Sequence, residues 1–147
     1  MSAQDENKEC QLPYGQVCWF EVPVYDIQRA SKLYAEVFEW KMNPEPRPMG
    51  MHGIKAMHMF TSLSKDFNGA FLAMEDGYEM TRYGKHDKEI LPPLATFCVK
   101  DCDETLKQVG ALGGRTQCHK TAIGHGQGYF ARFLDSEGNV MGIWSQN

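Results

Sequence analysis

At two places along this chain, a β-rich run is followed by a segment in which apolar residues recur with helical spacing. A β-rich run ends at Asp26, and apolar residues then recur every three or four positions as far as Phe38. A second β-rich run ends at Asp101, and the same spacing continues to Leu112, directly before Gly113. The pattern predicts two amphipathic helices, each N-capped by an aspartate, with glycine ending the second.

Short runs with strand character follow each predicted helix. The candidate strands are Trp40–Asn43, Ile54–Thr61 and Gly69–Met74 in the first half, and Arg115–Thr121, Gly128–Leu134 and Val140–Trp144 in the second. Turn residues between the last two runs predict a hairpin. Each half therefore reads as strand, helix and three strands. The two capping aspartates lie 75 residues apart (101 − 26), which indicates an internal repeat.

The repeat predicts an α+β fold built from two βαβββ modules within one domain, residues 1–147. Module one covers about residues 16–74 and module two about residues 94–145. A polar linker, residues 75–93, joins them and is long enough to cover a site or an interface. Each module is near the size at which a core alone is marginal, so we expect neither half to fold without the other.

Composition narrows the class of protein. The chain has 147 residues, 42% of them hydrophobic, and a net charge of −4, which is typical of a globular protein. The sequence contains no Lys/Arg cluster of the kind that binds nucleic acid. No apolar run approaches the length of a membrane span, and the N-terminus lacks the apolar core of a signal peptide. We therefore expect a cytoplasmic protein. The five cysteines, an odd number without a C-x-x-C pair, are expected to be reduced thiols.

Two segments carry a family resemblance. The run Trp19–Asp26 with Ala30 and Tyr34, and the closing run Gly128–Trp144 with its Asp-Ser-Glu-Gly-Asn turn, resemble the glyoxalase/bleomycin-resistance/dioxygenase superfamily, also called vicinal oxygen chelate. The resemblance extends over about residues 16–145. It implies a cup-shaped, mostly antiparallel half-barrel with a small-molecule site inside the cup. It also implies a homodimer, since such proteins often pair.

Metal-dependent members of this superfamily hold their ion with side chains from the first and fourth strands of each module. The resemblance places those four positions at Trp19, Phe71, Leu94 and Gly142. None of these side chains binds a divalent cation, so we expect no inherited metal and no cofactor. A site rebuilt from histidines stays an alternative, with two pairs spaced by six residues: His52 and His58, and His119 and His125.

Several residues could act on a ligand without a metal. If Trp19 faces the cup, strand alternation places Glu21 there too, as a general base or as a structural carboxylate. His58 faces opposite to Met57 and Met59, as a ligand partner or a surface residue. His125 lies in a glycine-rich hairpin and is a second candidate proton partner, whereas Arg132 is expected outside the cup. The expected ligand contacts are Trp19, Met57, Met59, Phe71, Tyr129 and Trp144.

Three functions fit these observations. The first is a metal-independent enzyme, such as an isomerase, lyase or cyclase, acting on an apolar or aromatic small molecule with Glu21, His58 and His125 as catalytic residues. The second is a ligand-binding or sequestration protein, which needs only an apolar cavity. The third is a metal-dependent enzyme of the glyoxalase or dioxygenase type.

Overall fold

The computed structural model describes residue 14, residues 17–78 and residues 92–147. Within them, module one contains β1 (Phe20–Val24), α1 (Ile27–Phe38), β2 (Lys41–Met42), β3 (Arg47–Met51), β4 (Ile54–Thr61) and β5 (Asn68–Met74). Module two contains β6 (Thr96–Cys98), α2 (Cys102–Ala111), β7 (Arg115–Ala122), β8 (Tyr129–Leu134) and β9 (Val140–Ser145). The duplicated α+β architecture that the sequence predicts is confirmed. The linker expected over residues 75–93 lies mostly outside the described residues.

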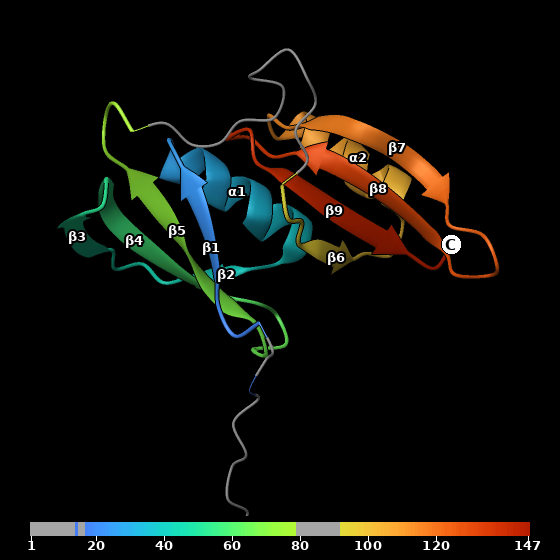
Figure 1. The fold of residues 1–147 in the computed structure, drawn as a ribbon, viewed down its shortest axis with the longest axis horizontal. Helices are drawn as coiled ribbons and strands as arrows, with labels where there is room; N and C mark the ends of the chain where they lie inside the picture. Colours follow the sequence, from blue (N-terminus) through green and yellow to red (C-terminus); the bar gives the residue numbers. More distant parts are fainter. Residues whose placement is uncertain (1–13, 15–16, 79–91) are drawn as a thin grey trace, which may run out of the picture.

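Each module forms its own sheet (Figure 1). The first has the order β1-β5-β4-β2, with β3 also paired to β4, and the second has the order β6-β9-β8-β7. In both, the first strand of the module runs parallel to the last strand, and the other pairs are antiparallel. The match in topology supports the repeat that the spacing of the aspartates indicated.

The helix ends follow the predicted chemistry, but one strand was missed. The Asp26 carboxylate accepts from Arg29 N at 3.1 Å, and the Asp101 carboxylate accepts from Asp103 N at 2.8 Å. Gly113 follows α2 with a φ of 93°, a conformation that glycine adopts without a steric penalty. Strand β3 escaped prediction because Pro48 and Gly50 interrupt its β pattern.

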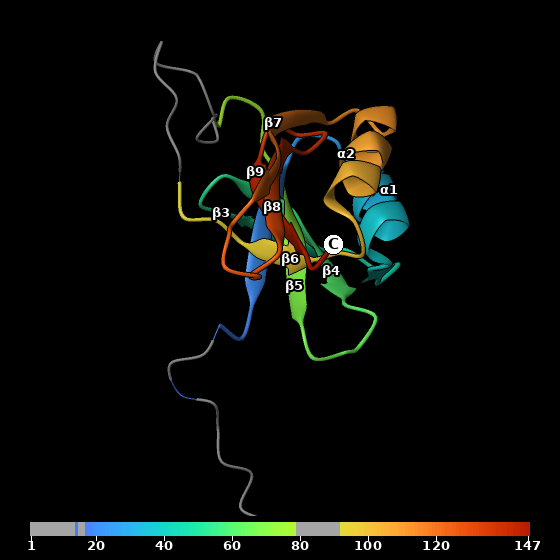
Figure 2. The ribbon, with the colours of Figure 1, turned by 90° about the vertical axis from the view of Figure 1, so that its right-hand side faces the viewer.

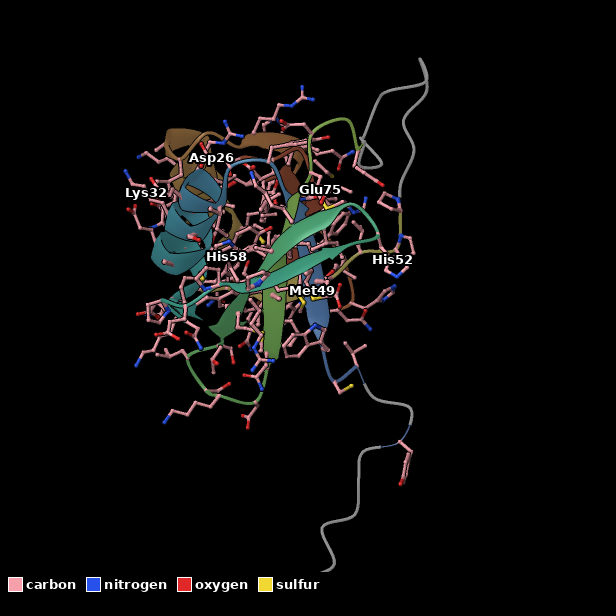
Figure 3. The ribbon with its side chains drawn as sticks, turned by 90° about the vertical axis from the view of Figure 1, so that its left-hand side faces the viewer. Asp26, Lys32, Met49, His52, His58 and Glu75 are labelled. Atoms are coloured by element: carbon pink, nitrogen blue, oxygen red, sulfur yellow. The ribbon has the colours of Figure 1, made fainter. Side chains whose placement is uncertain are left out.

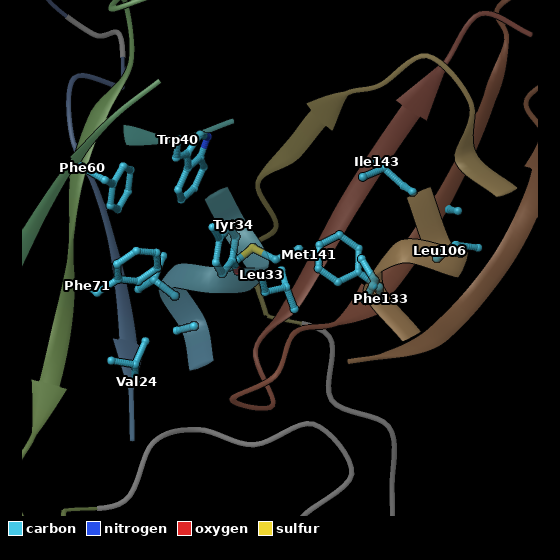
Figure 4. Packing of buried hydrophobic residues seen from close by; sticks show 14 of the residues in the cluster. Val24, Leu33, Tyr34, Trp40, Phe60, Phe71, Leu106, Phe133, Met141 and Ile143 are labelled. Carbon is cyan, nitrogen blue, oxygen red and sulfur yellow. The ribbon is translucent and has the colours of Figure 1, made fainter. Parts of the chain in front are cut away.

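A single core fills the space between the two sheets, with α1 at its centre. The Tyr34 ring lies 5.3 Å from the Phe71 ring of β5. One turn further along α1, the Phe38 ring lies 4.7 Å from the Phe97 ring of β6 and 6.2 Å from that of Phe133 on β8. Figure 4 shows α1 between the aromatic side chains of the two sheets, and Figure 2 shows α2 beside α1.

Each sheet packs one face against the shared core and the helices, and its other face is not covered by a helix of the described residues (Figure 2). We call these outward faces the first cup face, on the β1-β5-β4-β2 sheet, and the second cup face, on the β6-β9-β8-β7 sheet. The sequence left open whether the two modules close one cup within a chain. In this structure a single chain presents two open half-cups.

The β8–β9 hairpin fastens module two to module one through a polar cluster that we call the clasp. Glu137 accepts hydrogen bonds from Tyr25 N at 2.8 Å, Asp26 N at 2.7 Å and Arg29 Nε at 2.7 Å. The Glu137 side chain is fully buried, so these donors replace water around the carboxylate. The clasp therefore joins α1 and the end of β1 to the hairpin of the other module.

Two further residues of the hairpin extend the clasp. Tyr34 Oη donates to the Asp135 carboxylate at 2.7 Å, and Asn139 Nδ2 donates to Pro23 O at 2.9 Å. Burial raises the pKa of Asp135, and burial together with the negative charge of Asp135 raises the pKa of Tyr34. Burial also works to raise the pKa of Glu137, but the hydrogen bonds from Arg29, Asp26 and Tyr25 outweigh it and lower that pKa.

Among the helices of the described residues, none has both the length and the apolar character needed to cross a membrane. A cytoplasmic location stays a prediction.

Candidate functional site

The first cup face carries two rows of side chains that run across its strands. Strand register places Glu21, Ala70 and Met59 in one row. The next row contains Pro23, Leu72, Met57 and Arg47, in the order β1, β5, β4 and β3. The centre of this face is apolar and rich in methionine, which adapts to ligands of different shape. Charged groups stand at its two sides, with an exposed carboxylate on β1 and an exposed guanidinium on β3.

The second cup face is more aromatic. Register places Thr96, Gly142 and Arg132 in one row, and Cys98, Trp144 and Phe130 in the next. The Arg132 guanidinium lies over the Phe130 ring, 5.2 Å from its centroid, which is within the range of a cation–π interaction. Trp144 Nε1 donates to Gln127 O at 2.9 Å, a bond that holds the indole beside the glycine-rich hairpin.

The predicted ligand contacts divide between the two sides of the sheets. Met57, Met59 and Trp144 lie on the cup faces, as expected from strand alternation. Trp19 precedes β1 and is half-buried, at the position that alternation assigns to the first cup face. Tyr129 instead faces the helices, where its ring lies 4.7 Å from Lys120 Nζ, so the expectation that it faces the cup is corrected.

Phe71 requires the second correction. Its side chain is fully buried and packs against Tyr34 and Phe60 in the core. The register shows the reason: Glu21 pairs with Ala70 and Thr96 pairs with Gly142, so Ala70 is the module-one equivalent of Gly142. The sequence alignment was displaced by one residue, and one residue in a strand moves a side chain to the other face.

The three predicted catalytic residues are not brought together within the chain. Glu21 is exposed on the first cup face. His58 pairs with Phe71 and faces α1, on the opposite side of the same sheet, and burial lowers its pKa. His125 is exposed in the β7–β8 hairpin of the other module, with a φ of 54°. A direct proton relay between Glu21 and His58 would have to pass through the sheet.

Arg132 is a cup-face residue that sequence reasoning placed elsewhere. It shares a row with Gly142, whereas the sequence reading expected it outside the cup. If the register of β8 against β9 had been known, the pairing of Arg132 with Gly142 would have predicted that Arg132 lies on the cup face. Arg132 adds a cation to the second cup face, the less favoured of the two placements that the sequence allowed.

The four positions that hold metal in superfamily enzymes contain Trp19, Ala70, Leu94 and Gly142, with Ala70 in place of Phe71. A Cβ at position 142 would lie 2.6 Å from Thr96 Oγ1, so a longer side chain there would require the Thr96 hydroxyl to move. In the described ranges, no group of three or more His, Cys, Asp or Glu side chains is arranged to hold an ion. His52 lies at the β3–β4 turn and His58 near α1, well separated in Figure 3.

Comparisons with known proteins agree with this architecture. No protein-family model matches the chain. A glyoxylase-like domain-containing protein of Didymella fabae is 27% identical over 134 residues, which is 88% of this chain and 93% of that protein. A glyoxalase family protein from Bacillus cereus superposes with a TM-score of 0.69 at 10% identity, covering 92% of this chain and 97% of the other.

A third comparison concerns TnmS3, an antibiotic binding protein from Streptomyces sp. CB03234. Its structure matches with a TM-score of 0.58 at 20% identity, covering 91% of this chain and 98% of that one. The chain therefore has the fold of the glyoxalase/bleomycin-resistance/dioxygenase superfamily, as the resemblance predicted.

Proposed function

We propose that this protein binds a small apolar or aromatic molecule on its cup faces without the help of a metal ion. The observation that carries the proposal is the make-up of the two faces: methionines and Leu72 on the first, Phe130 and Trp144 on the second. Ligand sites in proteins are largely apolar with a few placed polar groups, and Glu21, Arg47 and Arg132 are charged side chains in the rows of these apolar residues. The binding function of TnmS3, which shares the fold, supports this choice.

Closure of the site is proposed to need a second copy of the chain. Each cup face is a single sheet, which forms only half of the cup that the family resemblance implies. Two copies related by a twofold axis can place the first cup face of one against the second cup face of the other. Such a homodimer would form two cups and bury the exposed apolar rows of both faces.

Native mass spectrometry of the freshly purified protein tests this function, together with the variant Met59→Arg. The wild type should be a dimer that carries a small molecule released unchanged. Met59→Arg replaces the methionine beside Ala70 with a cation and should abolish binding, because an apolar ligand would have to displace the water around the new charge.

Ala111→Arg is the control, since Ala111 is exposed at the end of α2, away from the first cup face, and it should bind as the wild type does. Retention of the ligand by Met59→Arg would move the site away from the first cup face.

A second candidate, acid–base catalysis on the bound molecule, is favoured by one observation. Glu21 lies on the first cup face in the row of Ala70 and Met59, where a bound ligand would contact its carboxylate. If Glu21 is the general base for an identified substrate, Glu21→Gln should lower kcat by about 100-fold or more while leaving ligand affinity nearly unchanged. Glu45→Gln, an exposed control, should retain turnover. Full turnover by Glu21→Gln would leave binding as the function.

A further inference from the structure

The hairpins that end the two modules are closed by the same backbone hydrogen bonds. In the β8–β9 hairpin, Asp135 N donates to Asn139 O at 2.8 Å. In the β4–β5 hairpin, Ser62 N donates to Phe67 O, also at 2.8 Å. Ser62 is therefore the counterpart of Asp135, and Phe67 is the counterpart of Asn139.

The interior of the hairpins completes the correspondence. Gly138 N donates to Asp135 O at 3.2 Å, and Lys65 N donates to Ser62 O at 3.0 Å. Both residues have a positive φ, 90° at Gly138 and 66° at Lys65. Gly138 and Lys65 are therefore equivalent positions, and so are the residues that precede them. Ser64 thus occupies in module one the position of Glu137 in module two. The acidic and amide residues of the clasp are replaced in module one by two serines and a phenylalanine.

This replacement changes what the hairpin does at the junction between the modules. At the β8–β9 hairpin, Asn139 donates a hydrogen bond to Pro23 O, and Glu137 accepts three hydrogen bonds from module one. The counterpart of Pro23, at an offset of 75, is Cys98. Phe67 and Cys98 therefore occupy the positions that Asn139 and Pro23 occupy in the clasp. Both line a cavity of about 730 Å³ between the β4–β5 hairpin and β6.

The walls of this cavity have a consistent chemistry. Its inner side is aromatic, with Phe38, Trp40, Phe67 and Phe97, and the Phe97 ring stands edge-on to those of Trp40 and Phe67. The remaining lining residues are aliphatic, small or hydroxyl-bearing: Val17, Ser62, Leu63, Ser64, Ala95, Thr96 and Cys98. Among the described lining residues none is charged. The size falls within the range of about 300–1,000 Å³ that holds small molecules.

We propose that this junction cavity is a second binding site, for an uncharged planar aromatic molecule. It is separate from the first cup face and borders the β6 edge of the second, whose Thr96 and Cys98 form part of its wall. The rings of Phe38, Trp40, Phe67 and Phe97 offer faces and edges to a flat ligand. The Ser62 and Ser64 hydroxyls, 3.3 Å apart, offer hydrogen bonds at the mouth. A charged ligand would lose its hydration there without gaining a partner. None of Glu21, Met57, Met59 or Leu72 lines the cavity.

Cysteine reactivity in the wild-type protein can locate a bound probe. The neutral fluorophore N-phenyl-1-naphthylamine is titrated first by fluorescence, and alkylation by N-ethylmaleimide is then followed by peptide mass spectrometry. Cys98 lines the cavity, Cys118 shares the row of Arg132 on the second cup face, and Cys18 is exposed near β1 outside the lining. With the probe at ten times its Kd, alkylation of Cys98 should slow about tenfold, and the other two should react unchanged.

Four results would overturn the proposal. Equal protection of Cys98 and Cys118 would place the probe on the second cup face. Loss of the Cys98 protection in Phe130→Ala would do the same, because Phe130 shares a row with Cys98 on that face but does not line the cavity. Unchanged alkylation of Cys98 with the probe bound would place it elsewhere. Protection of Cys98 that rises with protein concentration, without any probe, would mean that a second copy of the chain covers the cavity.

A filling variant gives an independent measurement. Ala95→Phe adds a ring inside the cavity and should weaken probe binding by about tenfold, a loss of about 1.4 kcal/mol. Ala111→Phe, which adds the same ring at the exposed end of α2, should bind the probe as the wild type does. Undiminished binding by a folded Ala95→Phe protein would contradict the assignment, and the thiol experiment decides the question should that variant not fold.

Discussion

Replacement of Phe71 by alanine should lower the free energy of unfolding by about 3–5 kcal/mol, as large-to-small substitutions in a packed core do. The Phe71 side chain is fully buried, and its ring lies 5.0 Å from that of Phe60 and 5.3 Å from that of Tyr34. Alanine would leave a void between β5 and α1 that these rings cannot close. Urea denaturation followed by circular dichroism measures the loss.

Phe130→Ala is the matched control for this prediction. Phe130 lies half-buried on the second cup face, so its removal should destabilise the protein clearly less and should instead weaken ligand binding. Phe71→Ala protein that remains folded should keep the affinity of the wild type. The opposite result, a stable Phe71→Ala protein that no longer binds the ligand, would mean that the Phe71 side chain contacts the ligand in the cup.

Replacement of Glu137 by alanine should cost about 3 kcal/mol, because each buried donor left without an acceptor costs about 1–3 kcal/mol. The backbone N–H groups of Tyr25 and Asp26 would lose their acceptor, and Arg29 would lose its ion pair. The Arg29 side chain is 47% exposed, so water compensates part of that last loss. Glu45→Ala removes an exposed carboxylate and should change stability by no more than about 0.5 kcal/mol.

The contribution of Glu137 should also depend on pH. Its pKa in the folded protein is held below the ordinary value of 4.5, so the folded state disfavours protonation. Its stabilisation is therefore complete above that value and is lost as pH falls through the folded pKa. The stability difference between the wild type and Glu137→Ala should shrink on acidification from pH 7 to pH 3. A constant difference would mean that the charge of Glu137 contributes little to the clasp.

Local patterns were sufficient for most of the elements. The helices after Asp26 and Asp101 were predictable because capping and the spacing of apolar residues are properties of neighbouring positions. The same holds for Ile54–Thr61, where the predicted strand and β4 coincide. Strand β3 was not predictable, since Pro48 and Gly50 are tolerated only through its pairing with β4.

Positions within the candidate site were predictable only where strand alternation began from a correct anchor. Met57 and Met59 were placed correctly on this basis, and so was the opposite orientation of His58. Phe71 was misplaced because the β4–β5 hairpin contains one residue more than its counterpart, six from 62 to 67 against five from 135 to 139. Hairpin length sets strand register, and a shift of one position exchanges the faces.

The sequence by itself determined the fold class of this protein: a duplicated βαβββ chain. Helix caps, the periodicity of apolar residues and the offset of 75 residues are properties of the amino-acid sequence, so they can be recognised without any knowledge of tertiary contacts. The tertiary structure alone decided how the modules face one another and which side chains share a surface. Those features depend on the packing of Tyr34 and Phe38 between two sheets and on the contacts of Glu137 across 112 positions of sequence, which no local pattern encodes.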